Sequence, residues 1–340
     1  MMRRNRSTTH RATPSPLVVL ISAGLMLALV GLVFWPRHSK KNLRTADKPT
    51  LHRATVQPTQ KHHVQPPVNN TAREGELRFY QGTVRGALPS SMRDSLSRED
   101  AKFLSALAAR LLIWRLDLRR DLRRGDYIRV AYKPIEEQSR FEIQAMTYKS
   151  LKHRQTFHFY RFKESGRKFA AYYDKNGRDI ELQLRNTPMR EYEQVTSILK
   201  MRRRHKGVDF KAPEGAKIYL PWRARVVRTN WNMRYNGQCV KVQFFKGRRI
   251  HGLFLHLSKV MPKVRRGAVL PAGTVIGLVG NTGRSTAAHL HYQLETRRGR
   301  VIDPFDYHKT YHRKIPSREL AMFQSYRRQL DRQFGQHTRK

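Results

Sequence analysis

The sequence has one cysteine, Cys239, among 340 residues, and few acidic side chains. A single thiol cannot form an internal disulfide, and without a Cys-x-x-Cys pair the chain has no thiolate zinc site. Cys239 is therefore expected to be a small buried side chain in a strand. The 25 Asp and Glu residues face 69 Lys and Arg, a formal net charge of +44. This excess predicts salt-sensitive attraction to anionic partners, without choosing among nucleic acid, membrane and cell wall.

Charge is missing altogether from residues 17–35, which are almost wholly apolar. A helix of this length spans about 28 Å, close to the ~30 Å hydrocarbon core of a bilayer. No small-x-small cleavage motif follows Trp35, so we interpret the segment as a transmembrane anchor rather than a cleaved signal peptide. Residues 1–16 would then be a basic cytoplasmic segment. Basic residues flank both ends of the span, so the positive-inside rule does not set its orientation.

Residues 37–73 contain scattered prolines and too few apolar side chains for a core, which predicts a disordered linker. Residues 74–195 then read as a smaller α+β domain. Ser97 to Asp100 resembles a helix capping box followed by leucines at helical spacing, and short alternating runs after Gly125 predict strands.

Residues 196–310 predict a mainly β domain built on an antiparallel sheet. Alternating or apolar runs at 224–227, 239–244 and 274–279 read as strands, and Gly and Pro separate them. Helical periodicity is nearly absent from this part of the sequence, so strands must supply its core.

Four histidines in this β-rich part have a spacing that suggests a metal site. His205 and Asp209 lie four residues apart at a turn that enters a strand, and His289 and His291 lie two apart, on one face of a strand. A catalytic zinc takes three protein ligands and keeps one open position. No His-Glu-x-x-His motif supplies a glutamate base, so one of the 289/291 pair and His256 are candidates for acid–base chemistry. A single histidine is more often structural; the combination predicts a metal centre.

These residues belong to a series of short motifs in a fixed order. The series resembles the lysostaphin/LytM-type zinc metallopeptidases over about residues 203–308, and residues 77–190 are similar to the regulatory domain of Gram-negative murein DD-endopeptidases. The motifs are His205-x-Gly207-x-Asp209, Ala212-Pro213-x-Gly215, His256-Leu257-Ser258, Gly280-x-Thr282-Gly283-Arg284-Ser285-Thr286 and His289-Leu290-His291-Tyr292.

The resemblance implies a zinc endopeptidase that cuts peptide cross-links or stem peptides of bacterial peptidoglycan, with the D-alanyl–diaminopimelate cross-link as the expected bond. It implies His205, Asp209 and His291 as zinc ligands and His256 and His289 as the catalytic pair. A wall substrate would also fix the topology: a single-pass inner-membrane protein, anchored through residues 17–35, with its catalytic domain in the periplasm.

Two other functions stay open. A degenerate relative could bind and activate a cell-wall amidase, although such proteins typically lack one or more ligands and all five positions are filled here. Nucleic-acid binding is not expected, because the chain has no zinc-finger spacing, helix-turn-helix or RNP-like motif.

The basic tail, residues 311–340, has apolar residues at near-helical spacing, including Leu320, Phe323 and Leu330. Two interpretations of this predicted helix fit the pattern. It packs on its own protein, or it contacts an anionic membrane or wall surface.

Overall fold

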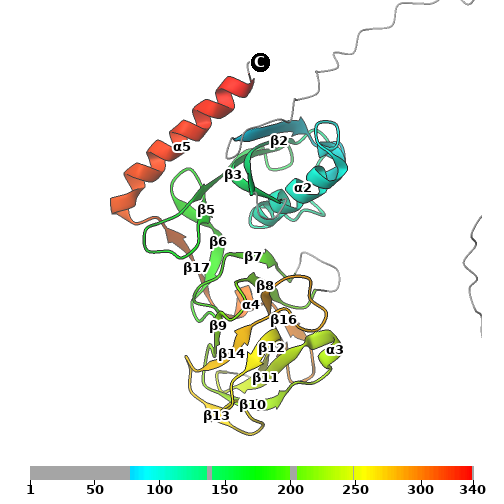
Figure 1. The fold of residues 1–340 in the computed structure, drawn as a ribbon, viewed down its shortest axis with the longest axis vertical. Helices are drawn as coiled ribbons and strands as arrows, with labels where there is room; N and C mark the ends of the chain where they lie inside the picture. Colours follow the sequence, from blue (N-terminus) through cyan, green and yellow to red (C-terminus); the bar gives the residue numbers. More distant parts are fainter. Residues whose placement is uncertain (1–76, 136–139, 200–204, 248, 339–340) are drawn as a thin grey trace, which may run out of the picture. The chain divides into compact units, whose positions relative to one another are not determined.

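The computed structural model describes residues 77–135, 140–199, 205–247 and 249–338 (Figure 1). The predicted anchor at 17–35 and the predicted linker at 37–73 lie outside these ranges. Within the described residues, no helix is both long enough and apolar enough to cross a membrane.

A first sheet of seven antiparallel strands has the order β1-β2-β3-β4-β5-β6-β17. Two helices, α1 (Leu88–Met92) and α2 (Arg98–Leu112), follow its first strand. Six of its strands come from the first part of the described chain: β1 (Arg78–Thr83), β2 (Tyr127–Ile135), β3 (Arg140–Ser150), β4 (Gln155–Phe162), β5 (Ala171–Tyr173) and β6 (Arg178–Leu184).

Helix α2 begins where the capping pattern predicted a helix. The Ser97 side chain accepts a hydrogen bond from the Asp100 backbone N–H at 3.1 Å, which satisfies one of the free donors at the helix start. Leu104, Leu111 and Leu112 are fully buried and pack with apolar residues of β2 and β3. The helix therefore covers one face of the first sheet with its apolar stripe.

The seventh strand of this sheet comes from the far end of the chain. Strand β17 (Thr310–Lys314) pairs with β6, and helix α5 (Ser317–Thr338) follows it. Phe323 and Leu330 of α5 are buried in one cluster with Tyr160 and Tyr173 of the sheet. Of the two interpretations of the tail, the structure shows the first: the apolar stripe of this helix packs on its own protein.

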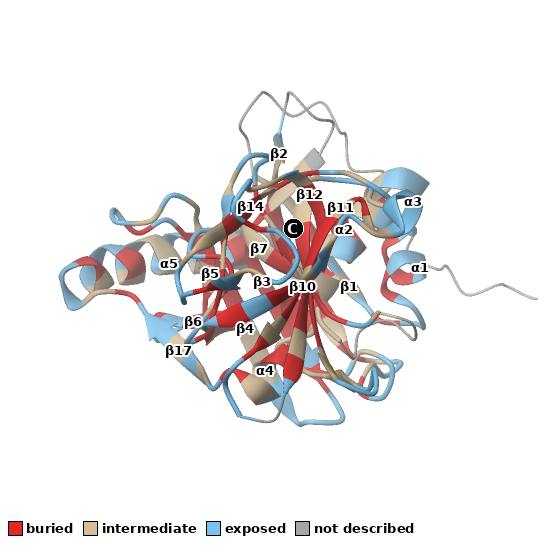
Figure 2. Cartoon of the chain, turned by 90° about the horizontal axis from the view of Figure 1, so that it is seen from below, coloured by how far each residue is buried: buried red, intermediate tan, exposed pale blue. Residues whose placement is uncertain are grey.

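A second sheet of ten strands has the main order β13-β10-β11-β12-β15-β8-β7, and β14, β9 and β16 pair beside this path. The mainly β, antiparallel fold predicted for this part of the chain is confirmed. The short helix α3 buries no side chain and appears exposed in Figure 2. The elements are β7 (Gln194–Ser197), β8 (Val208–Lys211), β9 (Lys217–Tyr219), β10 (Ala224–Thr229), α3 (Met233–Asn236), β11 (Gln238–Phe244), β12 (Ile250–Val260), β13 (Val269–Leu270), β14 (Val275–Val279), β15 (His289–Thr296), β16 (Val301–Ile302) and α4 (Pro304–Tyr307).

Strand β15 lies between β12 and β8, and this order brings distant motifs together. His291 pairs with Asp209 of β8 on one side and with Leu255 of β12 on the other. Side chains alternate along a strand, so the buried Leu290 and Tyr292 enter the core while the two histidines face the opposite side. The sheet thus gathers the polar groups on one face and leaves the apolar residues for the core.

His308, behind this strand, should make the fold sensitive to acid. His308 is 1% exposed, its ring centre lies 4.4 Å from that of Trp222, and its Nε2 lies 2.9 Å from the Tyr292 hydroxyl oxygen. Burial lowers the pKa of His308 to about 3, because a charged imidazole loses its hydration there. The stability gained by keeping this ring neutral is complete above the unfolded pKa of about 6.5 and is lost as the pH falls toward 3.

We therefore expect His308→Gln to flatten the acid limb of the stability curve. In the wild type, His308 should contribute a slope of up to about 1.4 kcal/mol per pH unit below pH ~6. Glutamine keeps a hydrogen-bonding group but does not titrate. Urea unfolding followed between neutral and acidic pH measures both curves. Parallel curves for the two proteins would show that His308 does not control acid stability.

Candidate metal centre

Three of the predicted site residues lie together near the first residues of β8. Asp209 belongs to β8, His205 precedes it, and His291 lies on the neighbouring strand β15. His205 Nε2 lies 3.0 Å from Asp209 Oδ2, and His291 Nδ1 lies 2.7 Å from Asp209 Oδ1. One ligand atom from each residue lies within 4.8 Å of the others. The side chains are only 11–16% exposed, so the cluster is largely screened from bulk water. The structure thus brings together the three residues expected to hold the metal.

The hydrogen bonding of the cluster fits a cation. His205 Nδ1 is 3.2 Å from the Ile198 carbonyl oxygen, which can only accept, so this nitrogen carries the proton. Nε2 then points its lone pair at a carboxylate oxygen of Asp209. Two acceptors at this distance repel unless a proton or a metal ion lies between them. Two imidazoles and one carboxylate are a ligand set that catalytic zinc uses, and the carbonyl contact is the usual support for such a ligand.

Asp209 is set up to be anionic. Burial raises the pKa of this carboxyl, but the neighbouring His205 and His291 rings outweigh burial and hold the pKa well below its ordinary value. The group therefore carries its negative charge across the physiological range, as a metal ligand must.

Gly207 gives the cluster its room. A Cβ at this position would lie 2.4 Å from the Tyr292 carbonyl oxygen and 2.8 Å from His291 Nε2. Both neighbours belong to β15, so a side chain would push the His205 turn away from His291. The glycine between His205 and Asp209 is thus a steric requirement of the site.

Gly207→Ala should accordingly weaken zinc binding by about 10–100-fold. This is the usual loss of affinity when a residue that positions a metal ligand is mutated. Competition with a chromogenic chelator measures the affinity. Gly166→Ala is the matched control, because no atom lies within 4 Å of the added carbon there. Equal zinc affinities in the two variants would contradict the steric role of Gly207.

The remaining two predicted residues lie beside the cluster. His289 Nδ1 is 2.8 Å from the Ala287 carbonyl oxygen, and its Nε2 is 3.8 Å from Asp209 Oδ1. His256 Nδ1 is 2.9 Å from the Thr282 carbonyl oxygen, and its ring centre is 4.9 Å from that of His289. In both rings the carbonyl contact places the proton on Nδ1 and leaves Nε2 with a lone pair.

His256 is held neutral. Burial lowers its pKa to about 4, and the bond to the Thr282 carbonyl offsets this only in part. The nearby His289 and His291 also disfavour a second positive charge. A neutral imidazole at pH 7 can accept a proton, so His256 meets the requirement for a general base.

The support of His256 by Thr282 is a feature that the sequence did not reveal. The Thr282 hydroxyl donates to the Leu257 carbonyl at 2.7 Å and accepts from the Gln238 N–H at 3.0 Å. Gly237, with φ +63°, allows this approach, because a Cβ there would lie 2.2 Å from the Thr282 hydroxyl oxygen. The Gly280–Thr286 motif was the available signal, but its spacing does not say which histidine it supports.

An antiparallel β-sheet that gathers a His/Asp/His cluster and two further histidines has the features of a metal-dependent hydrolase. The sequence of residues 203–304 matches Peptidase family M23. This part of the chain is a peptidase M23 domain, which confirms the family that the motifs resembled.

Known proteins similar to this chain include a peptidoglycan DD-endopeptidase and lysostaphin. Peptidoglycan DD-endopeptidase ShyA of Vibrio cholerae is 34% identical over 169 residues, covering 47% of this chain and 38% of ShyA. Lysostaphin of Staphylococcus simulans is 34% identical over 90 residues, covering 26% of this chain and 17% of lysostaphin. A solved zinc-containing peptidase from Vibrio cholerae is 24% identical and has a TM-score of 0.32, with coverage of 68% of this chain and 71% of that one. The chain therefore spans less than half the length of these two curated relatives.

Proposed function

We propose that this protein is a zinc-dependent endopeptidase that hydrolyses peptide cross-links or stem peptides of bacterial peptidoglycan. The observation that carries the proposal is the cluster of His205, Asp209 and His291, with the neutral His256 beside it, inside a peptidase M23 domain. The names of ShyA and other relatives as peptidoglycan DD-endopeptidases support the choice of substrate.

In this proposal His205 would hold zinc through Nε2, Asp209 through a carboxylate oxygen and His291 through Nδ1. A bound zinc ion with this ligand set would acidify a water molecule and polarise the scissile carbonyl. The contact of His205 with the Ile198 carbonyl orients one ligand, and Gly207 leaves room for the ring of His291.

His256 and His289 carry the proton transfers. Each is anchored through Nδ1 by a backbone carbonyl, so each presents Nε2 as its reactive atom. One takes a proton from the attacking water, and the other steadies the developing oxyanion or protonates the leaving amine. The fixed rings are ready before substrate binds, which lowers the cost of aligning them.

The substrate and the location are parts of the same proposal. The D-alanyl–diaminopimelate cross-link is the expected bond, and residues 17–35 would anchor the protein in the inner membrane. The catalytic domain would then lie in the periplasm, because peptidoglycan is found on that side.

Mass spectrometry of cleavage products tests the proposed reaction. Purified protein incubated with cross-linked muropeptide dimers should yield monomers, and a zinc chelator should stop the reaction. Products shortened by loss of the whole stem peptide would instead indicate an amidase. A folded, zinc-loaded protein that cuts nothing but accelerates a separate amidase would establish the activator function in place of the enzyme.

A further inference from the structure

A basic surface lies on the first sheet, well separated in sequence from the metal centre. It comprises the loop 117–124, which follows α2, and the turn 151–154, which joins β3 to β4. The loop reads Asp-Leu-Arg-Arg twice in succession. We call this surface the basic loop face, and its exposed residues are Arg119, Arg120, Arg123, Arg124, Leu151, Lys152 and Arg154.

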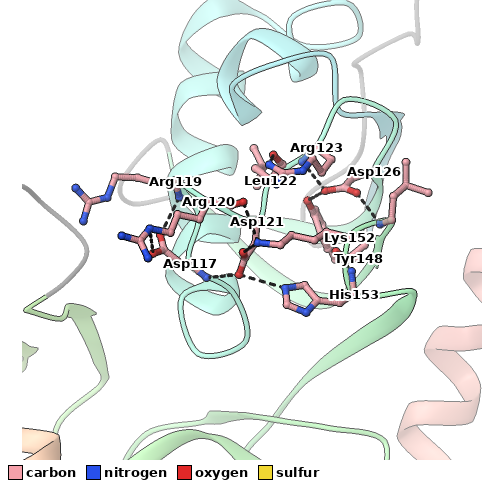
Figure 3. A network of polar contacts seen from close by, with 12 residues as sticks. Asp117, Arg119, Arg120, Asp121, Leu122, Arg123, Asp126, Tyr148, Lys152 and His153 are labelled. Carbon is pink, nitrogen blue, oxygen red and sulfur yellow. Dashed lines mark hydrogen bonds and ion pairs between the residues drawn. The ribbon is translucent and has the colours of Figure 1, made fainter.

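Two carboxylates, those of Asp121 and Asp126, are used inside the loop, whereas Asp117 is 44% exposed and lies 3.7 Å from Arg120. Asp121 accepts from the Asp117 N–H at 2.9 Å and pairs with His153 at 3.2 Å. Asp126, fully buried, accepts from the Arg123 and Leu151 N–H groups at 2.9 and 2.8 Å and from the Tyr148 hydroxyl. Figure 3 shows the Asp121 and Asp126 carboxylates within the network, while the side chain of Arg119 extends away from it. The loop thus turns the carboxylates of Asp121 and Asp126 inward, while Arg119, Arg123 and Arg124 are exposed.

The same contacts hold the turn 151–154 against the loop. Lys152 Nζ donates to the Arg120 carbonyl at 3.2 Å and to Asp121 Oδ1. Leu151 lies beside Gly125. A Cβ added at Gly125 would lie 2.9 Å from Cδ1 of Leu151. A leucine that is 50% exposed therefore lies next to a cluster of cations.

We propose that the basic loop face docks on the surface of an anionic phospholipid bilayer. The cations would contact lipid phosphates, and Leu151 would enter the boundary of the hydrocarbon region. An anionic polymer would attract the same charges but offers no apolar phase for the leucine. Helix α5 is not the docking element, since Phe323, Leu330 and Phe334 face its own sheet. The proposal does not depend on the peptidase activity.

The full chain can report on this contact through a single label. Its one native cysteine, Cys239, is fully buried, so a spin label at Leu151→Cys is selective. With vesicles containing about 30% phosphatidylglycerol, the label should become more accessible to oxygen than to a water-soluble relaxation agent, and a change to pure phosphatidylcholine should reverse this. Met322→Cys, on an exposed position of α5, should stay water-accessible on both vesicles.

Charge removal completes the test. Replacing the four arginines of the loop together with Gln should lower the occupancy of the docked state by about 100-fold or more at low salt. These arginines are Arg119, Arg120, Arg123 and Arg124. Changing four exposed arginines in the connections β12–β13 and β15–β16 to Gln removes the same charge and should have a much smaller effect; these are Arg265, Arg266, Arg297 and Arg298. Equal effects of the two sets, or a label at 151 that stays in water, would overturn the proposal. So would a label immobilised by purified peptidoglycan but not by vesicles, which would assign the face to the wall.

Discussion

Asp209→Ala should remove bound zinc and abolish peptidoglycan hydrolysis in one step. Asp209 contacts both His205 and His291, so its loss leaves two imidazoles with no charged ligand between them. His205→Ala and His291→Ala should likewise lose the metal, because catalytic zinc is held by three protein ligands. Inductively coupled plasma mass spectrometry gives the zinc content of each purified variant. Stoichiometric zinc in all three would refute the ligand assignment.

His289→Ala and His256→Ala are the informative contrast to the ligand variants. Neither ring is needed to hold the metal in our account, so both proteins should keep stoichiometric zinc. Turnover should fall by about 10²–10⁴-fold, the usual contribution of a positioned acid or base. If either variant loses its zinc, the division between metal ligands and proton-transfer residues is wrong.

Phe323→Ala should produce a large loss of stability without touching the metal centre. The Phe323 ring is fully buried, with its centre 5.5 Å from that of Phe162, 5.9 Å from Tyr173 and 6.3 Å from Tyr160. Removing a buried phenyl ring costs about 3–5 kcal/mol through lost burial and the cavity left behind. The free energy of unfolding measured in urea reports this loss.

Met322→Ala is the control for Phe323→Ala. Met322 is the neighbouring residue and is 55% exposed, so this substitution should change the free energy of unfolding by less than about 0.5 kcal/mol. Deleting residues 311–340 should be more severe than either change, because it removes β17 as well as α5. Equal stability of the Phe323→Ala and wild-type proteins would mean that α5 does not pack on the sheet in solution.

Part of the candidate metal centre could be anticipated from the sequence because strand geometry is local. A period of two places His289 and His291 on one face whatever the partner strands are. Gly207, two residues after His205, indicates the turn into β8. The pairing of His291 with Asp209 across 82 residues could be expected only from the family resemblance, since spacing alone does not choose which strands are neighbours.

The return of the C-terminal segment to the first sheet could not be predicted in the same way. Apolar spacing at Phe323 and Leu330 indicated a helix with one buried side, but it gave no partner for that side. The partner is a surface formed by residues 131–173, far away in the sequence. Non-local packing of this kind is set by the whole fold, and the basic residues of the tail equally suited an anionic surface. The support of His256 by Thr282 escaped prediction because a backbone carbonyl carries no sequence signal.

Release of soluble fragments from dye-labelled peptidoglycan tests the central claim most directly. The zinc-loaded protein should release dye, the chelated protein should release none, and adding zinc back should restore the activity. Asp209→Ala should stay inactive at every zinc concentration. Dye release by the chelated protein, or by Asp209→Ala at the wild-type rate, would contradict the assignment of the His205–Asp209–His291 cluster as the hydrolytic centre.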